Sequence, residues 1–395
     1  MTFRKWRRAV IERLKNAGLF LLASAHVVFF GARRRAPKNP SKIAILQGAK
    51  LGDMVCTTPL FHAIKKRFPH ARLVVLGDAV NQKLLHGHPE VDKYIVIGKS
   101  FWSAARVLAR EHADFGVLPL PSLYGLTLLI AGGVKAIAAP KIVGGYSPYE
   151  TRTYKKLLRA VIAIPHYNER YVPREYLRLL EPIGIKSDDT TKRLTYTAEA
   201  KASVNAFFEK QNIAPERDVI VGILPGVGGD PIKRWAPEKF AAVADYLAQK
   251  HGGRILVLGV GSDAQEVEKM MRAVKKETSA LNTLNRFSLE ELKAIIASFS
   301  LFISADTGPV YIAEAFGTPT IDIVGPMYEN IQPPQGKFHR TVAAPREKPA
   351  LGILDNTVYN AREARRQSED ITVEMVARVA DELILLSRNH EISAR

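Results

Sequence analysis

Short apolar runs alternate with longer segments of helical periodicity along most of this sequence. The run 42–46 (KIAIL) has the length and composition of a buried strand, and residues 57–68 carry apolar side chains at helical spacing. Further apolar runs lie at 71–77, within 89–97, at 113–118 and at 141–144, with helical segments at 100–111 and 123–131. Strands that alternate with helices predict a parallel sheet covered on both faces.

The second half of the chain repeats this alternation. Apolar runs lie at 218–224, 254–259, 301–304 and 320–324, separated by helical segments that include 237–251 and 310–316. We therefore predict an α/β protein with two doubly wound, Rossmann-like domains. The predicted divisions are an N-terminal segment and linker (1–41), a first domain (42–190), a second domain (191–370) and a C-terminal helix (371–395) that packs back on the first domain.

Composition agrees with a large globular protein. The chain has 395 residues, of which 47% are hydrophobic and 24% charged, and its single cysteine excludes an internal disulfide. No Cys/His cluster has zinc spacing, and no metal site is predicted. The net charge is +18, but residues 1–42 alone contribute +10 of it. The excess is thus a terminal feature, and we predict no nucleic-acid partner.

The N-terminal segment is amphipathic and basic. An uncharged stretch, 17–32, ends at Arg33, Arg34 and Arg35. As a helix it would be about 24 Å long, short of a hydrocarbon core of ~30 Å. A cleaved signal peptide, a short spanning anchor and a helix docked on the protein's own surface are the alternatives. We favour a helix that lies in the cytoplasmic leaflet of the inner membrane, held by apolar burial and anionic lipid.

Asp53 lies in the glycine-containing loop between the first strand and its helix. Open parallel sheets bind ligands at this end of their strands. Asp53 could be a helix N-cap, since Asp accepts hydrogen bonds from the first free amides of a helix. It could instead be a catalytic base for a hydroxyl held against it.

Aromatic and cationic residues are interleaved between 144 and 178. This pattern suits a single-stranded nucleic-acid platform, a pocket for an anionic sugar or phosphate, or an ordinary solvated helical surface. We favour the anionic acceptor because the charge is local and moderate. The residues assigned to acceptor binding are Lys50, Arg152 and Lys155.

Two loops of the second domain suit a diphosphate. In the loop 225–235, glycines let the backbone approach a phosphate and Lys233 or Arg234 can balance its charge. The loop 305–309 offers backbone amides and a hydroxyl at a helix start, where Asp306 could also be an N-cap. The donor-binding residues predicted here are Gly226, Gly228, Gly229, Lys233, Asp306, Thr307 and Gly308.

The motifs LGDMVCTTPLFHAIKKRFPHARLVVLG, HPEVD, VGILPG, KRWAPEKFAAVADYL, LGVGSDAQE and FSLEELKAIIASFSLFISADTGPVYIAEAFGTPTIDIVGP occur in order. Over about 42–330 the sequence resembles the heptosyltransferases of glycosyltransferase family nine. The resemblance implies a GT-B fold with the active site in a cleft between two domains. It also implies inverting, metal-independent transfer of heptose from ADP-heptose to the lipopolysaccharide inner core, with no cofactor.

The resemblance also assigns roles by position. Asp53 matches the general base and Lys233 the cation that meets the leaving diphosphate. Asp263 matches a position that holds the ribose or sugar, and Phe287 one beside the adenine. Residues 306–308 match the loop that grips the diphosphate and heptose. Tyr311, also assigned to donor binding, stands where the family usually has His.

The sequence leaves three alternatives to this function. Tyr311, and glycines at 228–229 where relatives carry Ser or Thr, leave open a catalytically degenerate, membrane-associated carbohydrate-binding or nucleotide-binding protein. A family member that uses another nucleotide sugar is the second alternative. A dinucleotide-dependent oxidoreductase is disfavoured because residues 48–53 do not match GxGxxG.

Overall fold

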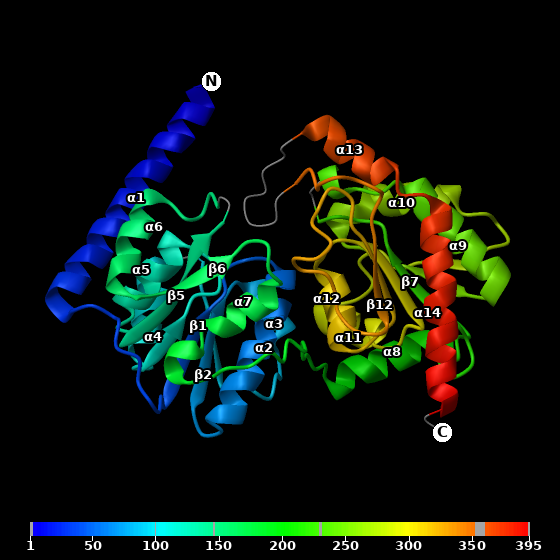
Figure 1. Cartoon of the computed structure of the whole chain (residues 1–395). Helices are drawn as coiled ribbons and strands as arrows, with labels where there is room; N and C mark the ends of the chain where they lie inside the picture. The colour runs from blue at the N-terminus through cyan, green and yellow to red at the C-terminus, as the bar shows by residue number, and fades with distance from the viewer. Residues whose placement is uncertain (1–2, 99, 145–146, 229–230, 352–359, 394–395) are drawn as a thin grey trace. The chain divides into compact units, whose positions relative to one another are not determined.

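The computed structural model describes residues 3–98, 100–144, 147–228, 231–351 and 360–393 (Figure 1). The chain divides into two compact units, Met1–Thr191 and Lys192–Arg395, and each is described separately below. This division lies one residue from the predicted boundary between 190 and 191.

The first unit is built on a six-stranded parallel sheet with the order β3-β2-β1-β4-β5-β6. Its strands are β1 Lys42–Leu46, β2 Arg72–Gly77, β3 Lys93–Val96, β4 Phe115–Val117, β5 Ala136–Val143 and β6 Ile162–Tyr167. From β1 the chain runs outward through β2 and β3, and then returns to place β4 on the other side of β1. The strand order reverses between β1 and β4, which is where doubly wound sheets bind ligands.

Helices cover both faces of this sheet. They are α2 Leu51–Arg67, α3 Ala79–Leu84, α4 Phe101–Ala109, α5 Leu123–Ala131, α6 Arg152–Leu157 and α7 Val172–Arg178. Figure 1 shows α4 and α5 on one face and α2, α3 and α7 on the other. The side chains of β1 from Ile43 to Leu46 are buried, because a central parallel strand is covered on both sides.

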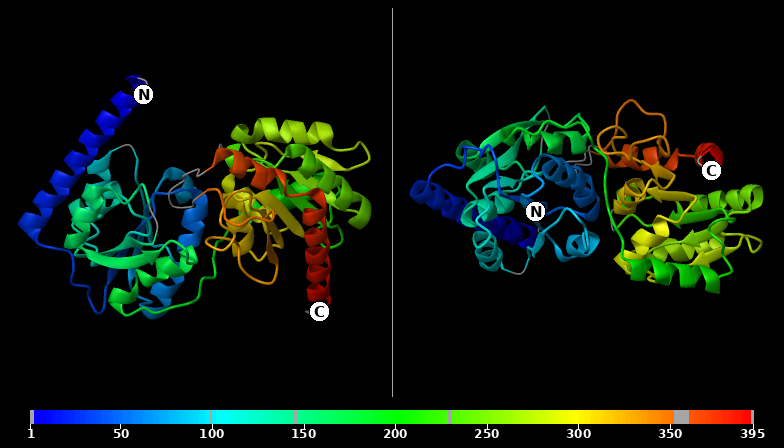
Figure 2. Two further views of the ribbon diagram at one scale, coloured as in Figure 1. Left: turned by 45° about the horizontal axis from the view of Figure 1, so that its top comes forward. Right: turned by 90° about the horizontal axis from the view of Figure 1, so that it is seen from below.

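Helix α1 (Phe3–Phe30) packs by one face on α5 and α6. Leu19, Phe20, Ala23 and Val27 join the core of the first unit there. The amino-terminal half of α1 extends past the helices on which it packs (Figures 1 and 2). In the described part of the chain, no helix combines the length and apolar character that crossing a membrane requires.

Arg33 fastens the chain after α1. Its amide donates to the Ala160 carbonyl at 2.6 Å, its carbonyl accepts from the Ile137 amide at 3.1 Å, and its guanidinium donates to the Phe30 carbonyl at 2.9 Å. Arg33 is buried and burial lowers its pKa. The three consecutive arginines therefore differ, since Arg34 and Arg35 are exposed.

Asp114 ties the start of β1 to the segment before β4. Its Oδ2 accepts from the Ser41 amide at 2.9 Å, the Ser41 hydroxyl at 2.7 Å and the Lys42 amide at 3.1 Å, and its Oδ1 lies 2.9 Å from Lys135 Nζ. Burial acts to raise the pKa of Asp114, but the bonds from Lys135 and Ser41 outweigh it and lower the pKa to about 2.

Asp114 is therefore expected to stabilise the fold in a pH-dependent way. A carboxyl whose pKa is lowered by folding contributes fully above its unfolded pKa of about 4, and the contribution is lost as the pH falls toward 2. Asp114→Asn should cost on the order of 1 to 2 kcal/mol near neutral pH, allowing for solvent screening. Urea unfolding of both proteins measures this, and the difference should narrow from about pH 5 downward. A difference that is constant with pH would contradict the assignment.

The second unit repeats the doubly wound plan, with strand order β12-β11-β10-β7-β8-β9. Its strands are β7 Ile220–Leu224, β8 Arg254–Val257, β9 Ala280–Asn282, β10 Leu301–Ala305, β11 Thr320–Ile323 and β12 His339–Val342. Its helices are α8 Ala198–Lys210, α9 Pro237–His251, α10 Ala264–Ala273, α11 Leu289–Ile296, α12 Gly308–Ala315, α13 Ala361–Glu369 and α14 Val373–Ser393. The order reverses between β7 and β10, so the loops after these two strands share the ligand-binding end of the sheet.

The C-terminal helix belongs to the second unit. Helix α14 contacts α9, β10, β11 and β12, and Val376, Ala380 and Leu383 lie in the same core as those elements. The Trp235 indole donates to the Ile371 carbonyl at 2.9 Å just before the helix begins. These contacts give α14 a place in the core of the second unit, and the predicted packing of residues 371–395 on the first domain stays a prediction. The apolar side of α14 covers the sheet of the second unit, one face of which would otherwise be partly exposed to solvent.

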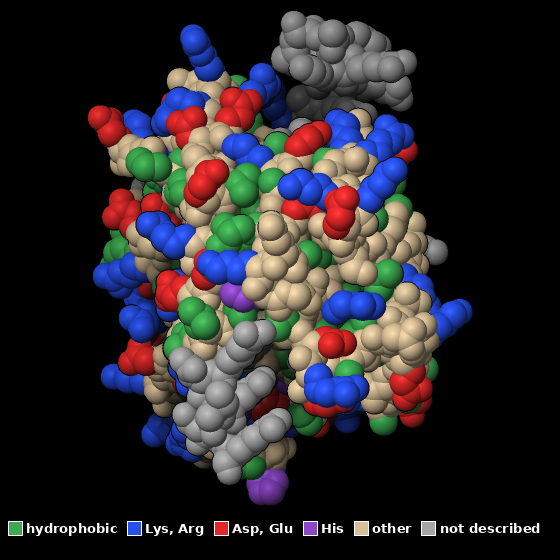
Figure 3. All heavy atoms as spheres, turned by 90° about the vertical axis from the view of Figure 1, so that its right-hand side faces the viewer, with side chains coloured by type: hydrophobic (Ala, Val, Ile, Leu, Met, Phe, Trp, Pro, Cys, Tyr) green, Lys and Arg blue, Asp and Glu red, His purple; other side chains and the backbone are tan. Residues whose placement is uncertain are grey.

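The face over α9 and α14 has no dominant charge. Figure 3 shows Lys and Arg interspersed with Asp and Glu across it. Some of these charges are paired, as in Lys250–Asp381 at 2.7 Å. This mixed surface contrasts with the basic N-terminal segment.

Candidate active site

Asp53 lies in the first turn of α2, directly after the carboxyl end of β1. The N-cap of α2 is Lys50, so the alternative that Asp53 is the N-cap is wrong. Its side chain is half-buried and partly accessible. A helix N-terminus favours a negative charge in its first turn. Asp53 therefore places a carboxylate at the switch point of the first sheet.

Gln47 holds the loop that leads from β1 into the first turn of α2, where Asp53 lies. The side chain of Gln47 is 1% exposed; its amide nitrogen donates to the Thr57 hydroxyl at 3.0 Å, and its amide oxygen accepts from the Ala49 amide at 3.2 Å. The Thr57 hydroxyl in turn donates to the Asp53 carbonyl at 2.7 Å. Asn81 donates to the Ala49 carbonyl at 3.0 Å. These bonds fix the loop from both sides.

Sequence reasoning missed Gln47 and Thr57. A polar residue at the end of an otherwise apolar strand was the available signal, since a buried amide must find partners.

Tyr176 and His166 lie under this part of the first unit. Tyr176 is on α7, which packs against α2, and its ring centroid is 6.4 Å from that of His166. Burial, and then the charge of Asp53, raise the pKa of Tyr176. Burial, followed by the charge of Arg178, lowers the pKa of His166 to about 4. Both are neutral at pH 7, so they add no charge beside the Asp53 carboxylate.

In the second unit, Lys233 and Asp306 meet at the β7/β10 switch point. Lys233 Nζ lies 2.9 Å from Asp306 Oδ2, and the Tyr311 hydroxyl donates to Asp306 Oδ1 at 3.2 Å. Both members of the ion pair are mostly but not fully buried. The N-cap of α12 is Thr307, so the alternative that Asp306 is the N-cap is wrong. Asp306 thus meets Lys233, which lies 73 positions earlier in the chain, and Tyr311, which lies five positions later.

The turn Pro231–Lys233 is supported from far along the chain. It packs against α13, where the Ser368 hydroxyl donates to the Ile232 carbonyl at 3.4 Å. Next to it, Arg234 forms an ion pair of 2.5 Å with Glu266, a buried residue of α10. Arg234 therefore neutralises a carboxylate, while Lys233 faces Asp306.

Asp322 on β11 is a further acid near this pair. It is 1% exposed, and neither of its carboxyl oxygens has a hydrogen-bond partner. Burial, and then the charge of Asp306, raise the pKa of Asp322 well above its ordinary value. No local pattern reveals this burial, because a single acid in an apolar strand (TIDI) is also typical of an edge strand.

Gly226 and Asp263 are packed against one another. A Cβ on Gly226 would lie 2.2 Å from Asp263 Oδ1, so only glycine fits there. Asp263 is buried and accepts from the Val260 amide at 3.0 Å, which closes the turn before α10. Gly228 has a φ of +59°, which favours glycine. Gly229 lies outside the described residues.

Phe287 precedes Ser288, the N-cap of α11, which forms a capping box with Glu291. The half-buried ring of Phe287 stands edge-on to the ring of Phe207, with centroids 5.2 Å apart. The Arg286 guanidinium lies 5.8 Å from the centroid of the Phe287 ring. The site therefore offers a flat apolar surface beside a cation.

The residues assigned to acceptor binding belong to two helix starts. Lys50 caps α2, while Arg152 begins α6 and Lys155 lies one turn further along it. All three are exposed, and Lys155 pairs with Glu150 at 3.0 Å. Of the interleaved aromatics, Tyr154 is a core residue whose hydroxyl donates to the Pro140 carbonyl at 2.8 Å. Core packing thus explains part of the interleaving of aromatic and cationic residues between 144 and 178.

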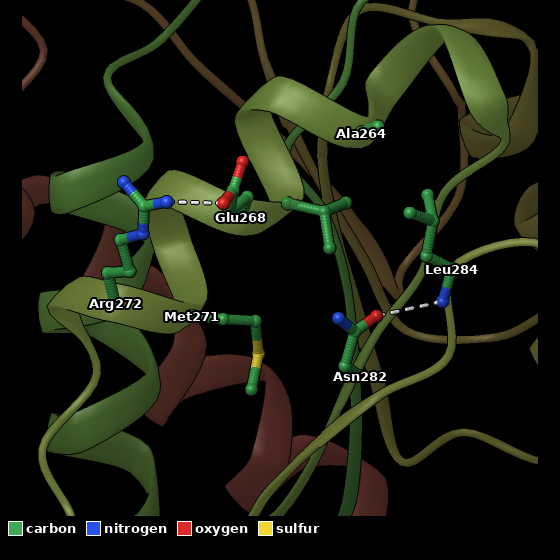
Figure 4. Close-up of a pocket in the computed structure, with 7 residues that line it drawn as sticks. Ala264, Glu268, Met271, Arg272, Asn282 and Leu284 are labelled. Carbon is green, nitrogen blue, oxygen red and sulfur yellow. Dashed lines mark hydrogen bonds and ion pairs between the residues drawn. The ribbon is translucent and has the colours of Figure 1, made fainter.

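A pocket of about 390 Å³ lies beside α10 (Figure 4). It is lined by Ala264, Val267, Glu268, Met271, Arg272, Asn282 and Leu284. Glu268 and Arg272 form an ion pair on one wall, and Asn282 accepts from the Leu284 amide at 3.0 Å on the other. None of the predicted site residues lines it.

The described residues contain no group of three or more His, Cys, Asp or Glu side chains arranged to hold a metal ion.

Solved structures identify the class of fold. The glycosyl transferase family 9 protein of Veillonella parvula superimposes with a TM-score of 0.71 at 20% identity, covering 89% of this chain and 99% of that one. The ADP-heptose lipopolysaccharide heptosyltransferase II of Escherichia coli gives 0.71 at 19% identity, covering 88% and 99%. Two doubly wound sheets in one chain, each with charged residues at its switch point, thus define a protein of the GT-B class.

Sequence comparison identifies the family. The model of glycosyltransferase family 9 (heptosyltransferase) matches residues 134–355, more than half of the chain. Lipooligosaccharide heptosyltransferase 2 of Campylobacter jejuni is 25% identical over 288 residues, covering 72% of this chain and 82% of its own length. Lipopolysaccharide heptosyltransferase 3 of Escherichia coli is 27% identical over 289 residues, covering 69% and 79%. The chain belongs to glycosyltransferase family 9, and it is a glycosyltransferase.

Proposed function

We propose that this protein transfers a heptose from ADP-heptose to the lipopolysaccharide inner core, with inversion at the anomeric carbon and without a metal ion. The observation that carries the proposal is the Lys233–Asp306–Tyr311 cluster at the β7/β10 switch point, inside the stretch that matches the family. A lysine and helix amides at this position suit a leaving diphosphate. The names of the relatives supply the donor sugar and the acceptor.

The proposed reaction is a single displacement. The Asp53 carboxylate takes the proton of an acceptor hydroxyl, and that oxygen forms a bond to the anomeric carbon opposite the diphosphate. The bond from this carbon to the diphosphate oxygen breaks, and the electron pair leaves with ADP. Lys233 and the amides at the start of α12 offset the charge that develops there. Asp263 and Phe287 are proposed to contact the ribose and adenine.

The acceptor explains the other predicted contacts. Lipopolysaccharide core is an anionic saccharide on a lipid anchor, so we propose that Lys50, Arg152 and Lys155 contact its negative groups. An enzyme with such an acceptor works at a membrane surface. We therefore propose that this one is peripheral on the cytoplasmic face of the inner membrane.

Nucleotide binding provides the test. Calorimetric titration of the full chain with ADP, UDP and GDP, in buffer containing EDTA, should show ADP bound at least about tenfold more tightly, a difference of ~1.4 kcal/mol. Transfer of heptose from ADP-heptose to heptose-deficient core is then measured by mass spectrometry.

The other outcomes separate the alternatives. Preference for UDP or GDP would keep the fold and discard ADP-heptose as donor. ADP binding with no transfer in the presence of acceptor would favour a degenerate binding protein.

A further inference from the structure

Helix α1 has two apolar faces on opposite sides. The inner face consists of Leu19, Phe20, Ala23 and Val27, which pack on α5 and α6. The outer face consists of Leu14, Leu21 and Val28, with exposed fractions of 68%, 66% and 80%. Residues seven apart lie two helical turns apart on the same side, and Gly18 and Ala25 fill the space between them. The outer face is thus a continuous apolar stripe that no described part of the first unit covers.

The inner face makes the docking of α1 specific. The Thr127 hydroxyl reaches the Leu19 carbonyl at 3.4 Å, and Lys156 Nζ lies 6.0 Å from the Phe20 ring centroid. Arg33 then fastens the chain just beyond the helix. Because the helix is held on this side, the direction in which the outer face points is fixed relative to the first sheet.

Cations flank the outer face. Arg13 and Lys15 are exposed near its amino-terminal end, and Arg34, Arg35 and Lys38 are exposed beyond its carboxyl-terminal end. Glu12 is the one acid between residues 1 and 42. Apolar side chains bordered by cations are complementary to the headgroups and acyl chains of an anionic bilayer.

We propose that the outer face of α1, together with Arg34 and Arg35, is a docking surface for an anionic lipid bilayer. The helix lies flat in the headgroup region by its outer face while its inner face stays on α5 and α6. A second copy of the chain is a poorer occupant, because two such surfaces would bring like charges together. The proposed function locates the protein at the inner membrane, and this proposal names the surface that binds there. It rests on the proposed function only for which membrane is bound.

This arrangement also orients the first unit. Helix α6 contacts α1, and it carries the exposed Arg152 and Lys155. Two of the three cations assigned to the acceptor, Arg152 and Lys155, therefore lie on an element that touches the helix proposed to bind lipid.

Vesicle binding tests the proposal. The full chain is sedimented with phosphatidylethanolamine vesicles that contain or lack phosphatidylglycerol. The variants are Leu21→Glu/Val28→Glu, Arg34→Ser/Arg35→Ser and the control Leu385→Glu. Leu385 is an apolar residue of α14 with a comparable exposed fraction, 56%, in the second unit. Thermal unfolding of each variant checks that the fold is retained.

The expected results differ between variants. The wild type and Leu385→Glu should bind the anionic vesicles equally. Leu21→Glu/Val28→Glu should bind at least about tenfold more weakly, because two apolar side chains no longer enter the bilayer. The affinity of Arg34→Ser/Arg35→Ser for anionic vesicles should fall about 25-fold, at about fivefold for each cation removed. This difference from the wild type should become smaller in high salt.

Unchanged vesicle binding by Leu21→Glu/Val28→Glu would overturn the proposal. So would a dimer of the wild type, seen by sedimentation velocity, that this variant abolishes, since the outer face would then belong to a second copy. Transfer to a water-soluble core fragment is measured in parallel and should be unaffected by all three variants. If vesicles bind but no protein transfers heptose, the proposed function fails and the docking surface stands.

Discussion

Asp53→Asn is expected to slow heptose transfer by about 10²- to 10⁴-fold, the range that a positioned general base contributes. Asparagine has nearly the same shape, and Gln47 and Thr57 hold this loop through backbone groups and each other, so the fold should be retained. ADP affinity should stay as in the wild type, because the nucleotide is assigned to the second unit. Single-turnover kinetics with saturating donor measure the effect on the chemical step.

Asp78→Asn is a matched control for this substitution. Asp78 stands at the same end of the same sheet, after β2, and its carboxylate caps α3 by accepting from the Asn81 amide at 2.7 Å. Asparagine caps helices about as well as aspartate, so little should change. Transfer by Asp53→Asn at the wild-type rate would remove Asp53 as the base. An equal loss in both variants would point to a general effect of lost negative charge.

Lys233→Ala is expected to lower kcat/KM by about 10²- to 10³-fold, as does loss of one group that stabilises a developing negative charge. ADP affinity should also fall. Lys233 offsets the charge of Asp306, and without it an uncompensated carboxylate would face the diphosphate.

A double-mutant cycle separates these two effects of Lys233. Asp306→Asn added to Lys233→Ala should restore part of the ADP affinity, because the repulsion is removed, while transfer stays slow. Lys250→Ala breaks an exposed ion pair of similar length, with Asp381, and should leave both quantities unchanged. If Lys233→Ala binds ADP and transfers heptose as the wild type does, the lysine serves only the structure.

The helices and strands that lie in the interior of each unit were predictable. The runs 42–46, 71–77, 254–259 and 301–304 are strands within a residue or two of their predicted bounds, because buried strands are continuous apolar runs bounded by turns. The edge strands β6, β9 and β12 were missed. Ile162–Tyr167 and His339–Val342 are only partly apolar, and they form strands because β5 and β11 offer unpaired backbone groups beside them.

The N-terminal helix shows the limit of a helical wheel. The wheel identifies α1 as amphipathic, but the stretch 17–32 is uncharged and has apolar residues on several sides, so periodicity could not separate the face that docks from the one that stays exposed. Packing on α5 and α6 makes that separation. For the same reason, a helix that lies in the membrane and a helix docked on the protein's own surface are mutually exclusive alternatives at the level of sequence. In the structure the two are compatible, because α1 docks by one face and leaves the other exposed.

By itself the sequence determined the fold class, the two-unit plan and the loops that carry Asp53, Lys233 and Asp306, because strand periodicity and loop composition are local properties. Only the tertiary structure decided what those side chains touch. The order of the strands brings the loop after β7 to the loop after β10, so Lys233 meets Asp306 across 73 residues, and the same packing buries Asp322 nearby and brings Ser368 of α13 under the Lys233 turn. Contacts between distant segments depend on how the sheet is wound, which no local pattern of residues encodes.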